Sequence, residues 1–306
     1  MRSLLLLAVL ALPVSAQGPT LLQRLGYPPD AKLLIVHADD LGMAHSVNAA
    51  VTPAFSTGLV NSGSIMIPCP WVPEVVSFAA KHPEADLGLH LTLTSEWTGL
   101  RWKPVLSRDD VPSLFDKAGY LHATEDQAAA RISPKEADEE IRAQIRRARE
   151  LGFKPTHLDS HMGTLYQTRE LFVVLMRVAR EEKLPARIGP SHVALPFASQ
   201  VLRPDDIVVD HIISIGDDVP ASEWATWYTN QLMNMKPGVT EVILHLAYDD
   251  AEMKAVAINH PAWGAAWRQR DLDFFTSDAF REILRKQNIK LITWREIGKL
   301  LTEARR

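Results

Sequence analysis

Leu34-Ile35-Val36-His37-Ala38-Asp39-Asp40-Leu41-Gly42 is the stretch of the chain that best indicates its fold. Its apolar, β-branched beginning predicts a buried strand at residues 32–37, and the polar side chains follow where that strand should end. Two adjacent carboxylates repel each other unless a cation or a shared proton relieves them. If the strand continued, Asp39 and Asp40 would point to opposite sides, so that one could bind a metal while the other handled a proton. The competing interpretation is an Asp pair that caps the next helix.

Two further apolar runs carry a single histidine. His90 interrupts Gly88-Leu89-His90-Leu91-Thr92, and His245 stands near the end of the run at residues 241–246. A lone histidine in such a place is more often a hydrogen-bonded core residue than a metal ligand. Neither run would indicate a site by itself.

The run Thr156-His157-Leu158-Asp159-Ser160-His161 gives a stronger signal. With the period-2 geometry of a strand, His157, Asp159 and His161 fall on one face. Three ionisable side chains on one strand face are costly to bury unless they pair with one another or bind a metal. The alternative is a buried His–Asp pair of purely structural use.

Short β-branched runs alternate with amphipathic stretches, which favours βα units around a parallel sheet or barrel. We expect strands at residues 32–37, 62–67, 87–93, 156–160, 186–188, 207–213, 241–246 and 290–293. We expect helices at residues 44–55, 72–81, 134–151, 169–182, 223–233 and 277–286. Ser133, Pro134 and Glu136 predict an N-cap, a first-turn proline and a capping box, and Gly152 predicts a helix end.

In (β/α) barrels the carboxyl ends of the strands converge on the active site. The Asp and His residues at four strand ends should therefore meet there. One Asp with two His leaves open coordination positions, as expected of a catalytic metal. The stretch at residues 95–132 fits the alternation poorly and is interpreted as an insertion. Its Trp97 and Trp102 either border the pocket or pack the insertion onto the barrel.

Composition sets further limits. The 306 residues are 46% hydrophobic with a net charge of -4, which gives no electrostatic footprint for nucleic acid. Cys69 is the only cysteine, so an intramolecular disulfide is excluded.

Residues 1–16 resemble an export signal that is too short to span a bilayer, with a buried helix as the alternative. We therefore expect one mature domain at residues 17–306, periplasmic or secreted, without stable membrane insertion.

Three blocks, at residues 34–42, 88–94 and 154–161, resemble in order the hallmark sequences of the YdjC/ChbG/HpnK family of carbohydrate deacetylases. Residues 184–187 and 268–277 resemble it as well. The resemblance implies a distorted (β/α) TIM-like barrel in a single domain. It also implies metal-dependent removal of an N-acetyl group from a sugar or oligosaccharide.

The resemblance also implies roles for individual residues. Asp40, His90 and His161 would hold one divalent metal ion, Asp39 would be the catalytic base, and His245 is the candidate acid.

Three further residues are candidates for supporting this site or contacting substrate. Asp159 could orient an imidazole. His157 is a substitute ligand because it shares a strand face with His161. Arg187 lies in one of the resembling segments.

Several points stay open at this stage. The family is described with Mg²⁺, whereas two His and one carboxylate suit Zn²⁺ better. Met162-Gly163-Thr164 and Leu246 depart from the family pattern, which puts sugar contacts and the placement of the acid in question. The alternatives are an exported non-catalytic glycan- or metal-binding protein and a metal hydrolase of another amide or an ester. The sequence identifies neither the sugar nor the oligomeric state, and a homo-oligomer is compatible with it.

Overall fold

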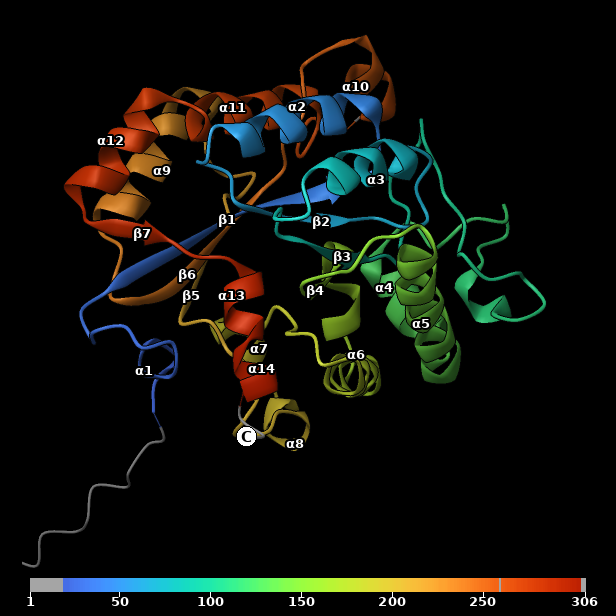
Figure 1. Cartoon of the computed structure of the whole chain (residues 1–306). Coiled ribbons are helices and arrows are strands. Elements are labelled where there is room, and N and C mark those ends of the chain that lie inside the picture. Colours follow the sequence, from blue (N-terminus) through green and yellow to red (C-terminus); the bar gives the residue numbers. More distant parts are fainter. Residues whose placement is uncertain (1–18, 259, 304–306) are drawn as a thin grey trace, which may run out of the picture.

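The computed structural model describes residues 19–258 and 260–303, so the expected export signal lies outside the described residues. Within these residues, seven parallel strands form one curled sheet in the order β4-β3-β2-β1-β6-β5, with β7 also paired to β1 (Figure 1). The strands are β1 (Lys32–Leu41), β2 (Ser62–Ile65), β3 (Leu87–Leu91), β4 (Leu158–Ser160), β5 (His211–Ile213), β6 (Gly238–Leu244) and β7 (Ile289–Leu291). The predicted distorted α/β barrel is confirmed.

The gap between β4 and β5 is bridged by the segment at residues 185–188. Arg187 N donates to Leu158 O at 2.8 Å on one side, and Val209 N donates to Ile188 O at 2.9 Å on the other. This segment was expected to be a strand, but only one isolated bridge, between Leu158 and Ala186, forms there. The barrel therefore closes through a few hydrogen bonds rather than a full ladder.

The other distortion lies at β1, whose two halves have different neighbours. β7 pairs with its first residues, up to Leu34, and β2 pairs from His37 onward, while β6 runs along the opposite edge. Asn61 fills the junction, since it exchanges hydrogen bonds with Val36 and donates from Nδ2 to Ile292 O at 2.9 Å. Two short strands thus share the edge that a regular barrel would give to one.

The inside of the barrel changes from apolar to charged along β1. Leu33 and Ile35 lie in an apolar cluster with Trp294 and the first helix. This cluster fills the barrel at the amino-terminal ends of the strands. His37 and Asp39, the next residues on the same face, are buried among polar groups. The polar layer therefore lies directly below the carboxyl ends of the strands.

Helices surround the sheet (Figure 1). The long ones are α2 (His45–Ser56), α3 (Val72–Lys81), α5 (Pro134–Glu150), α6 (Arg169–Glu182), α9 (Trp224–Met233), α11 (Ala265–Phe275) and α12 (Asp278–Lys286). The short ones are α1 (Leu21–Arg24), α4 (Glu125–Arg131), α7 (Pro190–Val193), α8 (Ala198–Val201), α10 (Ala251–Val256), α13 (Trp294–Gly298) and α14 (Leu300–Glu303), with 3₁₀ turns η1 (Pro112–Leu114), η2 (His161–Tyr166) and η3 (Ala221–Glu223). Among the described residues, no helix is long and apolar enough to cross a membrane.

The six predicted helices are found within two residues of their expected ends, whereas α11 was missed. The capping box of α5 is wrong. The side chain of Ser133 makes no capping hydrogen bond, and the Glu136 carboxylate instead accepts bonds from the backbone N–H and the hydroxyl of Ser113, both at 2.7 Å. Gly152 follows the helix with φ +84°, as a glycine after a helix end should.

Candidate active site

A cavity of about 780 Å³ opens at the carboxyl ends of the strands. Its lining includes Asp39, Asp40, His90, His161, Arg187 and His245, contributed by β1, β3, η2, the bridging segment and the end of β6. The structure therefore brings together the strand-end residues that the sequence singled out. The size suits a drug-sized or oligosaccharide ligand.

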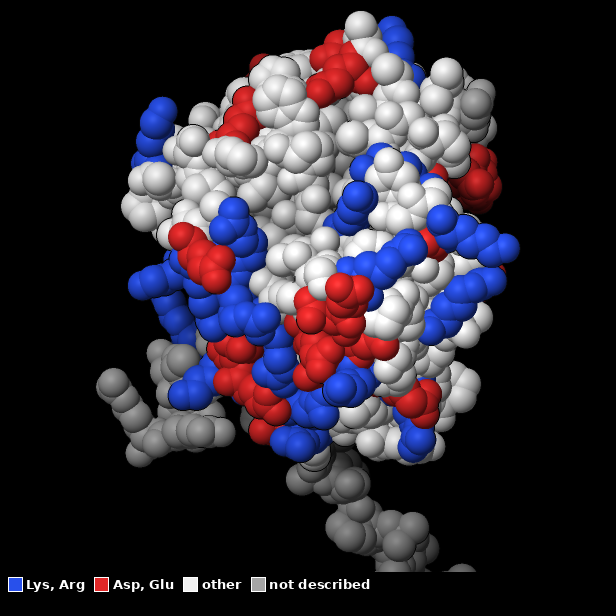
Figure 2. All heavy atoms as spheres, turned by 90° about the vertical axis from the view of Figure 1, so that its right-hand side faces the viewer, with Lys and Arg blue, Asp and Glu red and all other residues white. Residues whose placement is uncertain are grey.

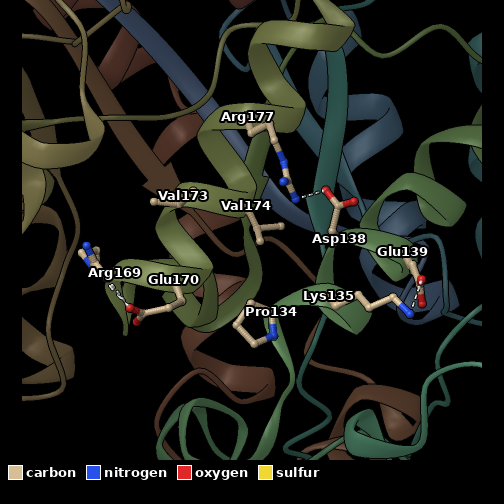
Figure 3. Close-up of a pocket in the computed structure, with 9 residues that line it drawn as sticks. All are labelled: Pro134, Lys135, Asp138, Glu139, Arg169, Glu170, Val173, Val174 and Arg177. Atoms are coloured by element: carbon tan, nitrogen blue, oxygen red, sulfur yellow. Dashed lines mark hydrogen bonds and ion pairs between the residues drawn. The ribbon is translucent and has the colours of Figure 1, made fainter.

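A second hollow of about 700 Å³ lies between α5 and α6 (Figure 3). Its charged side chains pair with one another on the surface: Arg177 with Asp138, Arg169 with Glu170, and Lys135 with Glu139. Figure 2 shows basic and acidic side chains interspersed over the lower half of the face that it presents. Exposed pairs of this kind carry little energy. None of the strand-end residues reaches this groove, so it is not the active site.

Asp40, His90 and His161 converge on one point of the large cavity. Oδ1 of Asp40 lies 3.5 Å from Nε2 of His90 and 3.5 Å from Nδ1 of His161. Atoms bound about 2.0–2.2 Å from a tetrahedral ion lie about 3.3–3.6 Å apart. Asp40 Oδ1 and His161 Nδ1 are also buried and make no hydrogen bond. The three side chains therefore fit a metal ion and could hold one.

Asp40 reaches this point through an irregular backbone. Its φ is +69°, and the pairing of β1 with β2 shifts register between Ala38 and Leu41. The expectation that Asp39 and Asp40 point to opposite sides is therefore wrong. The bulge turns Asp40 back toward the cavity, so that both carboxylates line it.

On each of these three side chains, the polar atom that does not face the point of convergence contacts a neighbouring residue. Asp159 Oδ1 lies 2.5 Å from His90 Nδ1, and Glu96 Oε2 lies 2.9 Å from His161 Nε2. Arg268 Nη2 donates to Asp40 Oδ2 at 2.7 Å. These contacts leave one free atom on each side chain, facing the others. Partners of this kind fix the orientation and tautomer of metal-binding histidines.

The charges around this point favour a cation. Burial raises the pKa of Asp40, but the charge of Arg268 and the neighbouring imidazole of His161 hold it well below its usual range, so the carboxylate is ionised. Burial lowers the pKa of His161, but the carboxylates of Glu96 and Asp40 raise it to about 10. A proton and a cation therefore compete for His161 Nδ1.

Asp39 lies beside these three residues. Arg187 donates from Nη2 to Asp39 Oδ1 at 2.8 Å, and His37 Nε2 lies 3.0 Å from the same oxygen. Oδ2 of Asp39 lies 3.8 Å from His90 Nε2. Burial raises the pKa of Asp39, but Arg187, His90 and His37 hold it well below its usual range. Asp39 is thus a buried carboxylate that stays ionised at the edge of the cavity.

His245 lies next to Asp39, near the Oδ2 atom of that carboxylate. Its Nε2 is 4.0 Å from Asp39 Oδ2, and its ring meets Trp263 edge to face at 4.9 Å. Its backbone N donates to Asp271 Oδ2 at 3.2 Å, which fixes the end of β6 against α11. Burial lowers the pKa of His245 to about 4, so the imidazole is neutral at rest.

His157 is not brought to the cavity. Its ring stacks on Trp294 at 5.6 Å, inside the barrel. A Cβ on Gly88 would lie 2.4 Å from His157 Nε2, so the ring is pressed against the backbone of β3. Burial, with the charge of His37, holds the pKa of His157 well below its usual range. His157 precedes β4 and does not line the cavity, whereas His161, at the start of η2, does.

The two tryptophans of the insertion differ. Trp97 lines the cavity, although it is only 3% exposed and Arg268 lies over its ring at 5.7 Å. Trp102 does not line the cavity; it donates from Nε1 to Thr94 O at 2.7 Å and packs behind His161. Further along the insertion, the start of α4 forms part of the cavity wall.

Several residues of the site were missed by the sequence analysis: Glu96, Arg268, Glu241, Asp271 and Trp263. Glu96 stands in the loop after the His90 strand, where a strand-end argument could have found it. Arg268 and Asp271 lie one helical turn apart on α11, a helix that was not predicted. No local pattern relates them to Asp40 or His245.

Comparison with known proteins places the chain in a family. The YdjC-like protein family matches residues 33–286. A carbohydrate deacetylase of Thermus thermophilus is 30% identical over 294 residues, which cover 92% of this chain and 99% of the relative. A carbohydrate deacetylase of Brevibacillus brevis is 27% identical over 87% of this chain and 99% of its own length.

A solved structure agrees on the fold. A crystal structure from Enterococcus faecalis V583, of a candidate cellobiose-phosphate cleavage protein, superposes with a TM-score of 0.71 and 24% identity. The match covers 87% of this chain and 99% of that one. With this fold, the match over residues 33–286 and the near full-length relatives, the chain belongs to the YdjC-like protein family.

Proposed function

We propose that this protein is a carbohydrate deacetylase, which hydrolyses the N-acetyl group of a sugar or oligosaccharide with the help of one divalent metal ion. The observation that carries the proposal is the convergence of Asp40, His90 and His161, each with its other polar atom occupied, beside the ionised Asp39. The names of the relatives support the substrate class.

Asp40, His90 and His161 would hold the ion. We propose Zn²⁺ or a similar transition ion rather than Mg²⁺. Two imidazoles suit such ions, and Arg268 keeps one oxygen of Asp40 occupied, so that only the other oxygen of Asp40 faces His90 and His161. A bound ion of this kind polarises an acyl oxygen and lowers the pKa of water.

The chain's own residues would move the protons. Asp39 is ionised and fixed by Arg187, so it can accept a proton from the attacking water. His245 is neutral at rest and cannot begin as an acid. The proton that it gives to the leaving amine would come from Asp39, whose Oδ2 is 4.0 Å from His245 Nε2. The two residues would thus transfer one proton between the two sides of the amide.

The cavity walls suit a sugar. The metal-site residues and Arg187 form a polar floor, and Trp263, Ile212 and Ile243 contribute apolar surface. Trp263 is half-buried and lines the cavity. An apolar lining with a few convergent polar groups is typical of small-molecule sites. We propose that Trp263, rather than Trp102, contacts a sugar ring.

The protein would act outside the cytoplasm, on an envelope or environmental glycan. This part of the proposal is supported by the signal-like pattern of residues 1–16 alone. N-terminal sequencing of protein from its native host tests it. A mature start near Gln17 is expected, and an intact Met1 in a cytosolic fraction would contradict it.

Acetate release tests the activity. Metal-free protein should be supplied with Zn²⁺ or Mg²⁺ and offered N-acetylated sugars of increasing length beside a simple acetate ester. Release from the sugars, lost in Asp39→Asn, supports the proposal. Cleavage of the ester alone would favour a hydrolase of another bond. Binding of the sugars without release would favour a non-catalytic binding protein.

A further inference from the structure

Below the cavity floor, two carboxylate oxygens and two nitrogen donors form a closed four-atom arrangement. The oxygens are Asp39 Oδ1 and Asp159 Oδ2. His37 Nε2 lies 3.0 and 3.1 Å from them, and Arg187 Nη2 lies 2.8 and 2.9 Å from the same two atoms. Each nitrogen therefore lies within ion-pair distance of the same two carboxylates, and His37 Nε2 also makes a 3.1 Å hydrogen bond with Ser64 Oγ.

Both donors are held from behind. Arg187 Nε lies 3.1 Å from Glu241 Oε2, and His37 Nδ1 lies 2.9 Å from Ser62 Oγ and 3.6 Å from Glu241 Oε1. Trp294 Nε1 donates to Glu241 Oε1 at 2.9 Å. The side chain of His37 is fully buried, so no water competes for its two nitrogens. Side chains from β2, β4 and β6, together with Asp39 of its own strand, therefore fix the position of its ring.

The two bridged carboxylates serve different parts of the proposed reaction. Asp159 holds His90, a residue of the metal site, while Asp39 is the proposed proton acceptor. Three buried carboxylates, those of Asp39, Asp159 and Glu241, face Arg187 in this layer, and one guanidinium cannot satisfy all of their oxygens. His37 supplies the second donor.

Asp39 lies close enough to the proposed ion that its carboxylate could turn and bind it. Its Oδ2 is 3.8 Å from His90 Nε2, an atom that faces the proposed ion. Asp39, His90 and Asp159 are close enough to form a metal-binding group of their own. A carboxylate bound to the ion would be a poor proton acceptor, because the cation would stabilise its charged form.

We propose that His37 is a positioning residue that holds Asp39 away from the metal ion, so that this carboxylate stays free to accept a proton. The inference rests on the proposed function and adds a residue to it. Removing the donor of His37 should let Asp39 turn toward the ion. Metal binding would then persist while turnover fell.

The test compares His37→Leu, which removes both donors, with His37→Gln, which keeps one amide donor. His157→Gln is the matched control, because His157 is also buried, its ring lies 5.0 Å from that of His37, and it does not form the ion pairs with Asp39 and Asp159 that His37 forms. Each protein is loaded with Co²⁺, whose visible spectrum reports the number of ligands. Acetate release from an N-acetylated oligosaccharide is measured on the same samples.

His37→Leu should bind Co²⁺ with a spectrum shifted toward a higher ligand number. Its kcat should fall about 10²-fold with little change in KM, as for a misplaced catalytic group. His37→Gln should recover most of both properties, and His157→Gln should keep the wild-type spectrum. If His37→Leu does not fold, the smaller change in His37→Gln, compared with wild type, carries the same test. An unchanged cobalt spectrum in a folded His37→Leu protein would overturn the proposal.

The two proposals fail in different ways. Wild-type protein that binds Co²⁺ but releases no acetate would contradict the proposed function, and the cobalt spectra would still decide the role of His37. Equal losses of kcat, metal affinity and melting temperature in His37→Leu and His157→Gln would show a purely structural role and overturn the inference.

Discussion

Arg268 and Asp40 are 228 positions apart in the chain, and a 2.7 Å hydrogen bond joins Nη2 of the arginine to Oδ2 of the aspartate. Arg268 also donates from Nε to Trp263 O at 2.6 Å, so its guanidinium is fixed on both sides. This contact decides which oxygen of Asp40 is left to face His90 and His161. A residue outside the proposed ligand set thus shapes the metal site.

Arg268→Gln should therefore weaken metal binding. Loss of a partner that orients a ligand typically costs about 10–100-fold in affinity. Chelator competition with Zn²⁺ measures the change. Arg270→Gln is the matched control, because Arg270 lies on the same helix over the ring of Trp224. Equal affinity in the two variants would show that Arg268 does not orient Asp40.

Metal affinity should rise with pH. In the metal-free protein Glu96 and Asp40 outweigh burial and raise the pKa of His161 to about 10, so Nδ1 carries a proton at neutral pH. A metal ion has to displace that proton, and binding becomes easier as the proton concentration falls. Titration with Zn²⁺ at about pH 6 and about pH 8 should show tighter binding at the higher pH. Affinity that is constant or falls over this range would contradict the assignment of His161 as a ligand.

Asp39→Asn should keep the metal and lose turnover. The amide preserves the size of the side chain but cannot accept the proton, and loss of a general base costs about 10²–10⁴-fold in kcat. Metal content and acetate release are measured on the same preparation. Full activity in this variant would remove Asp39 from the proposed mechanism.

Trp263→Ala should weaken substrate binding, whereas Trp102→Ala should lower the stability of the fold. Trp263 is half-buried beside His245, so its loss should raise KM for an oligosaccharide about tenfold and leave cleavage of a small acetate unchanged. Trp102 is buried behind His161, so its loss should cost about 3–5 kcal/mol of stability. Thermal unfolding and kinetics on both substrates separate these effects. Similar losses in both variants would leave Trp263 without a role in sugar binding.

The sequence predicted the barrel well because the hydrophobic periodicity of helices and strands, and the residues that start and end helices, are local features of a sequence. The bounds of α3 and α6 match the prediction to the residue. Strand ends were less accurate. The expected strand at residues 207–213 shortens to β5, because only its last three residues find a continuous partner in β6. Pairing depends on neighbours that are distant in the chain.

The site was predictable in part for the same reason. His90 interrupts an apolar strand, and His161 ends a run in which ionisable residues alternate with others, and both patterns are visible in one sequence. The turn of Asp40 into the cavity was not visible, because it depends on a left-handed backbone and a register shift against β2. Glu96 and Arg268 were missed because their roles come from contacts made only in the folded chain.

A zinc titration of acetate release tests the central claim most directly. Metal-free protein is given increasing amounts of Zn²⁺ and a fixed, saturating N-acetylated oligosaccharide. Release should begin only with metal and level off at one ion per chain, and Asp40→Ala should stay inactive at the same zinc concentrations. Full release by the metal-free protein, or wild-type release by Asp40→Ala, would contradict the claim that Asp40, His90 and His161 hold the ion that this deacetylase requires.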